Sequence, residues 1–190
     1  GNLGIAIAAK SPPDGYTILL ATSSIAVSPS LYANPGYDPV SDLAPVARLT
    51  SIPNILLVHP SVPAKTLRQF IELARAHPGK LNFGSGGAGT TNHLANELLK
   101  HLEKINIVHV PYKGGGPMLL DLIGGQLQIA FDNLPSSISQ LRAGKVRALA
   151  VTPAPRWPGA PAIPTPRAAR VPRYEPSSAV APRPPAGGPR

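Results

Sequence analysis

The 190-residue sequence contains no cysteine, which excludes disulfide bonds, thiolate metal sites and thiol catalysis. Its five histidines include no HExxH pair, so their spacing does not indicate a metal site. No run of about 18 apolar residues occurs, so the sequence predicts no membrane-spanning helix. The first ten residues have neither a starting Met nor the charged-then-apolar layout of a signal peptide.

The formal net charge of +9 and the 25 prolines are concentrated towards one end of the chain. Residues 153–190 hold 12 of the prolines and six arginines but only one acid, Glu175. This segment has no lysine, and aromatic residues make up 5% of the chain, so we predict no nucleic-acid partner. It also lacks a periodic apolar face, so we predict an irregular Pro/Ala/Arg-rich tail.

The rest of the chain alternates short apolar segments with amphipathic segments of roughly ten residues. This alternation is typical of βαβ units, so the predicted fold class is α/β with mainly parallel sheets. The nearly continuous apolar run 16–21 predicts a strand buried on both faces. Thr66 and Gln69 match a capping box at the start of a helix. Later strands are predicted at 107–110, 127–131 and 146–152.

Residues 81–94 combine a short predicted strand, a glycine-rich turn and the beginning of a helix. Four glycines lie within positions 84–89, so backbone N–H groups can come close to a ligand. Thr90, Thr91 and Asn92 are all candidate N-caps for the helix that follows. Because a helix N-terminus attracts anions without a charged side chain, we hypothesise that a small carboxylate binds here.

The glycine-rich stretch also allows other interpretations. Gly84, Gly86 and Gly89 satisfy the GxGxxG pattern of nucleotide-binding α/β enzymes, but no acid follows the next strand to bind a ribose. Ser85 with His93 suggests a nucleophile and a base, yet no GxSxG motif supports hydrolysis. His93 is interpreted either as a packing or capping residue or as a ligand contact.

Polar residues also follow two other predicted strands, where ligands gather in open α/β sheets. Ser23 and Ser24 follow the strand 16–21, either as ligand contacts or as part of a solvated loop. Asp132 follows the strand 127–131, where it either forms a turn or meets an amine or hydroxyl of a ligand.

Short motifs occur in a fixed order along residues 1–152, and as a set they are specific although each one is brief. They include Pro13-Asp14-Gly15-Tyr16-Thr17, Tyr37-Asp38-Pro39, Pro78-Gly79-Lys80-Leu81-Asn82-Phe83-Gly84-Ser85, His109-Val110-Pro111-Tyr112-Lys113-Gly114 and Ala143-Gly144-Lys145-Val146-Arg147-Ala148-Leu149. Together they resemble the tripartite tricarboxylate transporter substrate-binding proteins, the Bug or TctC-like family of bacterial periplasmic receptors.

The resemblance implies a type II periplasmic-binding-protein fold with two α/β lobes. Residues 1–47 would form part of the first lobe, 48–152 the second lobe with its hinge-crossing strands, and 153–190 the tail. It implies a non-enzymatic, monomeric periplasmic receptor without a cofactor, which passes a small carboxylate or dicarboxylate to integral membrane transporter subunits. It places Ser85, Gly89, Thr90 and Thr91 in the family's glycine-rich loop, and Ser23, Ser24 and Asp132 near the cleft. Together with Gly86 and His93 from the reading of the loop itself, these are the predicted ligand-binding residues.

The sequence departs from the family pattern at both ends. The opening strand and the loop that grips the other side of the carboxylate would lie before Gly1, and the tail resembles a decayed continuation. We therefore expect an incomplete first lobe, exposed apolar strand edges, and weak carboxylate binding or none. Alternatives are a nucleotide-binding α/β enzyme that uses the GxGxxG turn, or a pseudogene product without function.

Overall fold

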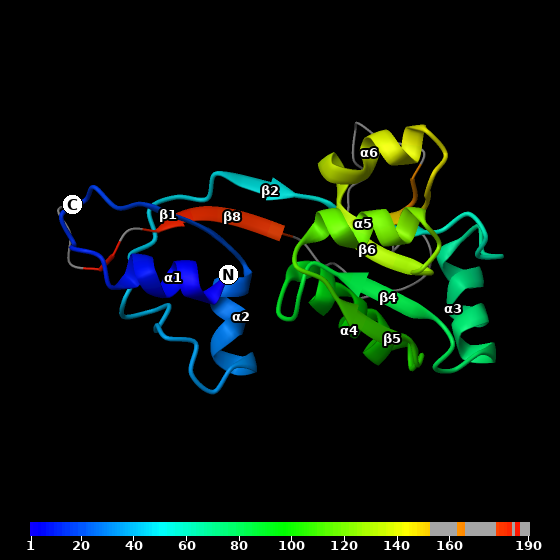
Figure 1. Cartoon of the computed structure of the whole chain (residues 1–190), viewed down its shortest axis with the longest axis horizontal. Coiled ribbons are helices and arrows are strands. Elements are labelled where there is room, and N and C mark those ends of the chain that lie inside the picture. The colour runs from blue at the N-terminus through cyan, green and yellow to red at the C-terminus, as the bar shows by residue number, and fades with distance from the viewer. Residues whose placement is uncertain (153–162, 166–177, 184, 187–190) are drawn as a thin grey trace. The chain divides into compact units, whose positions relative to one another are not determined.

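The computed structural model describes residues 1–152, 163–165, 178–183 and 185–186. It divides into two compact units. Unit 1 comprises Gly1–Ile52 with Ser178–Arg190, and unit 2 comprises Pro53–Ser177. Strands and helices alternate along much of the chain, in agreement with the predicted α/β class (Figure 1).

Unit 1 contains a small three-stranded sheet and two short helices. The strands are β1 (Leu19–Thr22), β2 (Thr50–Ile52) and β8 (Ser178–Arg183), in the order β1-β8-β2, with β8 antiparallel to both neighbours. The helices are α1 (Asn2–Ala9) and α2 (Ser24–Leu31). Their inner faces pack on the sheet through a small core, formed by Ile5, Ala21, Ile25, Tyr37 and Leu43.

The prediction of an irregular tail was wrong for residues 178–183, because they form the central strand of the unit 1 sheet. Val180 pairs with Thr22 on one side and Thr50 on the other, so this strand holds β1 and β2 together. The pairing with β2 ends at Val180, so among the described residues Pro182 pairs with β1 alone, and proline is tolerated where a strand is unpaired on one side. The prediction for residues 153–162, 166–177, 184 and 187–190 lies outside the described residues.

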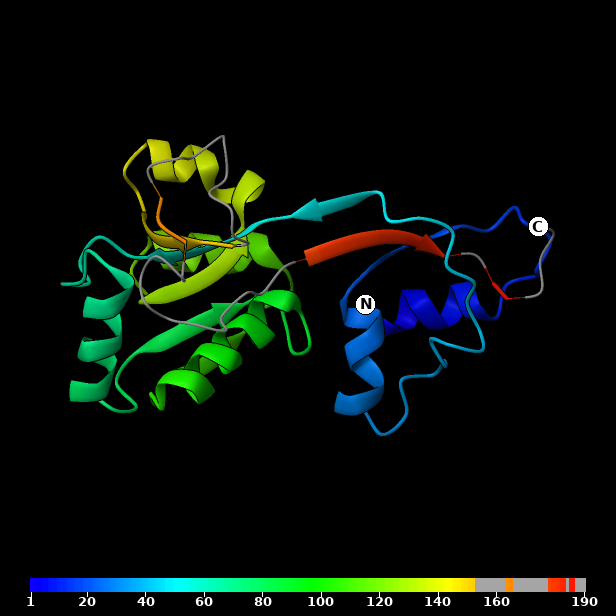
Figure 2. The same cartoon turned by 180° about the vertical axis from the view of Figure 1, so that it is seen from behind.

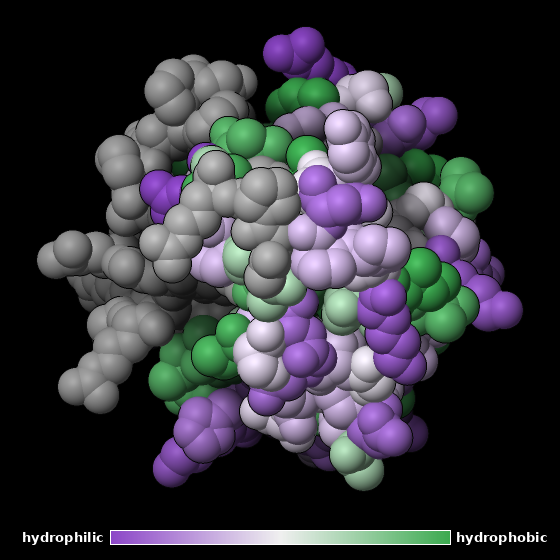
Figure 3. Space-filling view, turned by 90° about the vertical axis from the view of Figure 1, so that its left-hand side faces the viewer, coloured by the Kyte–Doolittle hydropathy of each residue, from purple (hydrophilic) through white to green (hydrophobic). Residues whose placement is uncertain are grey.

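The strand predicted at 16–21 is not buried on both faces. Tyr16, Ile18 and Leu20 are 93%, 67% and 63% exposed, whereas Ala21 is buried. Positions two apart in an extended segment lie on the same face, so these three side chains give one apolar surface. Hydrophobic residues reach the molecular surface beside hydrophilic ones in Figure 3. β1 also lies at one end of the described unit 1 sheet, so the expected exposed apolar strand edge is present.

Unit 2 contains a five-stranded sheet with the order β5-β4-β6-β3-β7. The strands β4, β5, β6 and β7 run in one direction and β3 runs against them, so the sheet is mainly parallel. The strands are β3 (Asn54–Val58), β4 (Asn82–Ser85), β5 (Val108–Pro111), β6 (Ile129–Asn133) and β7 (Arg147–Val151). The helices are α3 (Leu67–Ala76), α4 (Thr91–Glu103), α5 (Gly115–Ile123) and α6 (Leu134–Arg142).

The unit 2 sheet lies between two helical layers, so it is buried on both faces. Leu56 and Val58 of β3 join a core with α3 and α4, whereas Ile55 and Leu57 join a second core with α5 and α6. Figure 1 shows α5 and α6 on one side of the sheet, and Figure 2 shows the same layers from behind. The predicted N-cap is present, since Thr66 Oγ1 accepts from the Gln69 N–H at 3.2 Å. The Gln69 side chain accepts from the Lys65 N–H at 2.8 Å and not from the Thr66 N–H of a full capping box.

Candidate functional site

The candidate site is built where three parallel strands of unit 2 each lead into a helix. β4 pairs in parallel with β5 and β6, so the carboxyl ends of all three strands lie at one edge of the sheet. These ends continue into the N-termini of α4, α5 and α6. The first N–H groups of a helix have no intrahelical partner, and the helix dipole makes this end positive. The edge therefore favours an anion.

Glycines bring the turn after β4 (residues 86–90, the glycine-rich loop) against the start of α5. The Gly114 N–H donates to Gly86 O at 3.2 Å. A Cβ at Gly86 would lie 3.4 Å from backbone atoms of Gly114 and Gly115. Gly87 has a φ of 128° and Gly89 a φ of 79°, and residues with a side chain rarely adopt such positive φ angles. The absence of side chains thus lets two helix N-termini approach the same loop.

Of the three candidate residues, Thr90 is the N-cap of α4. Its Oγ1 accepts from the His93 N–H at 3.3 Å and donates to Gly87 O at 2.7 Å. Thr91 is the first residue of the helix, and its Oγ1 donates to Asn92 Oδ1 at 3.4 Å. The glycine-rich loop and the helix are therefore fixed to each other through one threonine hydroxyl.

Ser85 lies at the end of β4 and is fully buried. Its Oγ lies 2.7 Å from His109 Nε2 and 3.2 Å from both the N and the O of Gly87. The serine therefore fixes the turn. The histidine near the serine hydroxyl is His109, whereas the sequence pattern had drawn attention to His93.

His109 is the part of the site that sequence reasoning missed. Phe83 and His109 are register partners in the parallel pair β4–β5, so both side chains lie on the face covered by α4. Their rings stack with centroids 4.7 Å apart. The available signal was a single polar residue inside the apolar strand 107–110, which predicts a specific partner for that residue.

His93 lies in the first turn of α4, and its side chain is 15% exposed. Its Nδ1 accepts from the Gly89 N–H at 3.2 Å, and its ring centroid lies 4.2 Å from that of His109. Burial lowers the pKa of His93, and the nearby Glu97 carboxylate opposes that shift. Burial also lowers the pKa of His109 to about 4, with a further contribution from His93. Both rings are therefore neutral at pH 7.

Asp132 is 2% exposed at the end of β6. Its Oδ2 accepts from Ser137 Oγ at 2.7 Å, within the first turn of α6. A Cβ at Gly115 would lie 3.4 Å from Asp132 Oδ1, which places the carboxyl beside the start of α5. Burial raises the pKa of Asp132, while its hydrogen bonds to Ser137 and Asn133 favour the ionised form. The carboxyl thus holds the start of α6 and lies beside the start of α5.

Ser23 and Ser24 belong to unit 1, where they begin α2 directly after β1. Ser24 Oγ lies 2.7 Å from Thr22 Oγ1. Ser23 Oγ is shielded from solvent and has no hydrogen-bond partner among the described residues. Such a hydroxyl is unusual, because buried polar atoms generally have partners.

The first glycine of the GxGxxG pattern has a packing role. A Cβ at Gly84 would lie 2.7 Å from Met118 Cγ and still closer to Leu127 Cδ1. Both contacts belong to the core beneath α5, and Gly84 is buried. Close packing of α5 on β4 therefore requires glycine here. This packing explains the first glycine of the GxGxxG pattern, so nucleotide binding is not needed to explain it.

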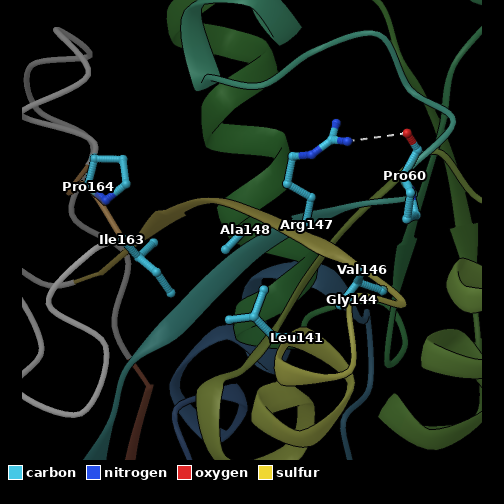
Figure 4. A pocket seen from close by; sticks show the side chains of 8 residues that line it. All are labelled: Pro60, Leu141, Gly144, Val146, Arg147, Ala148, Ile163 and Pro164. Atoms are coloured by element: carbon cyan, nitrogen blue, oxygen red, sulfur yellow. Dashed lines mark hydrogen bonds between the residues drawn. The ribbon is translucent and has the colours of Figure 1, made fainter.

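A pocket of about 400 Å³ lies elsewhere in unit 2, along β7 and the end of α6 (Figure 4). Its walls are largely apolar, with Leu141, Val146 and Ile163 among them. The Arg147 guanidinium at its rim donates to the backbone carbonyls of Pro60 and Ala64. None of the predicted site residues lines this pocket, so it is separate from the glycine-rich loop.

Two features are absent from the described part of the chain. Within it, no group of three or more His, Cys, Asp or Glu side chains is arranged to hold a metal ion. None of the helices found there is long and apolar enough to cross a membrane.

Solved structures with the same fold define the class of protein. Rpa4515 of R. palustris, solved with adipate, is 42% identical with a TM-score of 0.94, over 100% of this chain and 64% of that one. The periplasmic binding protein BugD is 30% identical with a TM-score of 0.92, over 100% of this chain and 63% of that one. MatC of Rhodopseudomonas palustris, with bound malate, is 31% identical with a TM-score of 0.91, and the match covers 99% of this chain and 64% of that one. The fold is that of periplasmic binding proteins.

The family follows from the sequence match. Residues 1–189 match the model of the tripartite tricarboxylate transporter family receptor, and the chain belongs to this family. Similar curated proteins include BugT of Bordetella pertussis, 36% identical over 87% of this chain and 51% of its own length. Another is a UPF0065 protein of Pseudomonas sp. strain P51, which is 36% identical over 92% of this chain and 52% of its own length. The chain thus spans about half the length of these relatives. The family predicted from the motifs is confirmed.

Proposed function

We propose that the glycine-rich loop of unit 2 captures a carboxylate group of a small mono- or dicarboxylate, as part of an extracytoplasmic solute-binding protein. The observation that carries this proposal is the convergence of the α4 and α5 N-termini on a loop without side-chain bulk. Two helix N-termini supply N–H donors and positive dipole ends for an anion. Adipate and malate in the related structures are ligands of this chemistry.

The proposed residues act in two ways. Gly86 lies in the loop before α4 and Thr91 at the start of α4, where the positive end of the helix dipole favours an anion. Ser85, Gly89, Thr90 and His93 hold the turn through hydrogen bonds within it. Asp132 lies beside the start of α5, where it would meet a hydroxyl or amine of the ligand. In unit 1, Ser23 and Ser24 remain proposed ligand contacts, and the Ser23 hydroxyl has no hydrogen-bond partner among the described residues.

The wider role follows from family membership. A receptor of this family serves a tripartite transporter, so we infer integral membrane transporter subunits as partners and the periplasm as the location. We further infer a monomer that binds its ligand without chemical change and without a cofactor. The fully buried Ser85, whose hydroxyl is already bonded to Gly87 and His109, supports binding over hydrolysis.

The proposal is tested by thermal unfolding of the full chain with adipate, malate and other small acids. A ligand that binds only the folded state raises the midpoint. We expect at least one acid to do so, and isothermal titration then gives its affinity. Thr90→Val removes the hydroxyl that caps α4 and should weaken the binding.

Thr66→Val is the matched control, because Thr66 caps α3 with the same chemistry and lies away from the glycine-rich loop. Both variants should lose about 1 kcal/mol of stability, and Thr90→Val alone should lose affinity. Equal affinities for the two variants would contradict the proposed site. A midpoint raised by an adenine nucleotide and by none of the acids would favour the nucleotide-binding alternative.

A further inference from the structure

Two histidines from different elements lie in tilted ring contact beside the glycine-rich loop. His93 comes from α4 and His109 from β5, and their ring centroids lie 4.2 Å apart. Both rings also stack on Phe83 of β4, with centroids 6.5 Å and 4.7 Å from it. The aromatic packing fixes where each ring nitrogen lies.

Each histidine holds a different part of the loop through one ring nitrogen. His109 Nε2 lies 2.7 Å from Ser85 Oγ, which in turn accepts from the Gly87 N–H at 3.2 Å. His93 Nδ1 lies 3.2 Å from the Gly89 nitrogen. A backbone N–H can only donate, so His93 Nδ1 must be an acceptor and therefore carries no proton. The ring proton of neutral His93 then lies on Nε2, on the side of Glu97.

The network closes through the helix cap. Gly87 O accepts from Thr90 Oγ1 at 2.7 Å, and the same hydroxyl accepts from the His93 backbone N–H at 3.3 Å. The turn is therefore tied to the start of α4 by Thr90 and His93, and to β5 by His109.

We propose that His93 and His109 are positioning residues that hold the glycine-rich loop in its carboxylate-accepting form only while both rings are neutral, so that acid switches capture off. This inference rests on the proposed function of the loop. Protonation of His93 at Nδ1 replaces an acceptor with a donor and breaks the bond from Gly89. Two imidazolium rings 4.2 Å apart would also repel each other.

The charged groups around the stack come from α4. Glu97 Oε1 lies 3.9 Å from His93 Nε2 and 2.8 Å from Lys100 Nζ, so the carboxylate is shared with the lysine. Lys100 Nζ lies 5.4 Å from the centroid of the Phe83 ring. Burial, the largest cause, lowers the pKa of both histidines, and the pKa of His109 falls to about 4. The switch therefore operates as the pH falls from about 6.5 towards 4.

The test compares the pH dependence of adipate and malate binding in the full chain and in a double variant, His93→Phe with His109→Phe. Phenylalanine keeps the stacked rings and removes the nitrogens. At pH 7 the double variant should bind roughly two- to tenfold more weakly, as expected for a lost hydrogen bond. The wild type should lose affinity between pH 6.5 and 4, and the variant should show a smaller decline. Protonation of the acids themselves is common to both proteins.

His101→Phe is the matched control, because His101 is exposed and lies near the other end of α4. It should keep the wild-type affinity and pH profile. Affinity that rises on acidification would overturn the proposal, since it would mean that an imidazolium binds the carboxylate directly. Identical pH profiles of the wild type and the double variant would also overturn it.

A second measurement does not depend on ligand binding. Long-range ¹H–¹⁵N correlation spectra report the histidine tautomers. The chemical shift of the Gly89 amide proton reports whether His93 Nδ1 still accepts its hydrogen bond. We expect His93 to carry its proton on Nε2 at pH 7 and the Gly89 amide to titrate together with His93. A proton on Nδ1 at pH 7 would refute the loop-holding role. If no acid binds but the tautomer and the amide behave as expected, the proposed function fails while the two histidines still hold the loop.

Discussion

Glycine at position 84 illustrates how much one side chain decides at the centre of unit 2. The residue is buried where β4 meets α5, and the space that a Cβ needs is filled by Met118 and Leu127. Core side chains are packed as closely as in organic crystals, so neighbours have little freedom to move away. Close helix–sheet packing, and through it the position of the α5 N-terminus, depends on this glycine.

We predict that Gly84→Ala destabilises the protein by about 1–3 kcal/mol, the usual cost of overpacking a core. Urea unfolding monitored by circular dichroism measures the loss. Gly116→Ala in α5 is the matched control, because a Cβ there would meet nothing within 4 Å. That variant should be neutral or gain about 0.5–1 kcal/mol, since alanine favours the helix. Equal stabilities of the two variants would contradict the packing argument.

At the scale of single elements, β8 has the largest consequence for unit 1. The strand separates β1 from β2 and pairs antiparallel with both, although some 125 residues of unit 2 lie between β2 and β8 in the sequence. Without it, β1 and β2 would have no partner in this sheet. The short strand therefore completes the unit 1 sheet.

We predict that Val180→Pro opens unit 1 and leaves unit 2 folded. Val180 pairs with both Thr22 and Thr50, and proline removes the N–H from the middle of this ladder. Limited proteolysis with mass spectrometry should show faster cleavage within residues 1–52, while residues 53–152 stay resistant. Val180→Thr keeps the N–H and the branched side chain and should be cleaved like the wild type. Equal cleavage of the proline variant and the wild type would show that β8 is dispensable.

At the scale of the whole molecule, the two units differ in how well their sheets are covered. The unit 2 sheet has a packed core on each face. In unit 1, Tyr16, Ile18 and Leu20 are exposed on one face of β1 and the segment before it. Within the described part of the chain, β1 pairs with a strand along one edge only, that of β8. An exposed apolar edge strand is a template for pairing with another chain.

We predict that the chain aggregates through this surface as its concentration rises. Replacing Ile18 and Leu20 together with threonine should raise the concentration at which light scattering detects particles. Val46→Thr with Leu49→Thr is the control, because these residues are 65% and 64% exposed but lie in a loop before β2. If the two double variants delay aggregation equally, general hydrophobicity rather than the β1 surface is responsible.

The sequence by itself determined the features that depend on neighbouring residues. The alternation of apolar segments predicted the α/β class, Thr66 and Gln69 predicted a helix start, and the glycines of 84–89 predicted a close-approach turn before a helix. Local hydrogen bonds and backbone freedom produce these features, so a few adjacent residues suffice to predict them. The ordered motifs also identified the family.

Tertiary structure decided the features that join residues far apart in the chain. Ser85 and His109 meet only because β4 and β5 pair in one register, and no local pattern specifies that register. The strand β8 forms because the backbone of a proline-rich segment finds two partners, which its composition did not indicate. The burial of Tyr16, Ile18 and Leu20 was misjudged for the same reason, since burial depends on what packs against a strand as well as on its own residues.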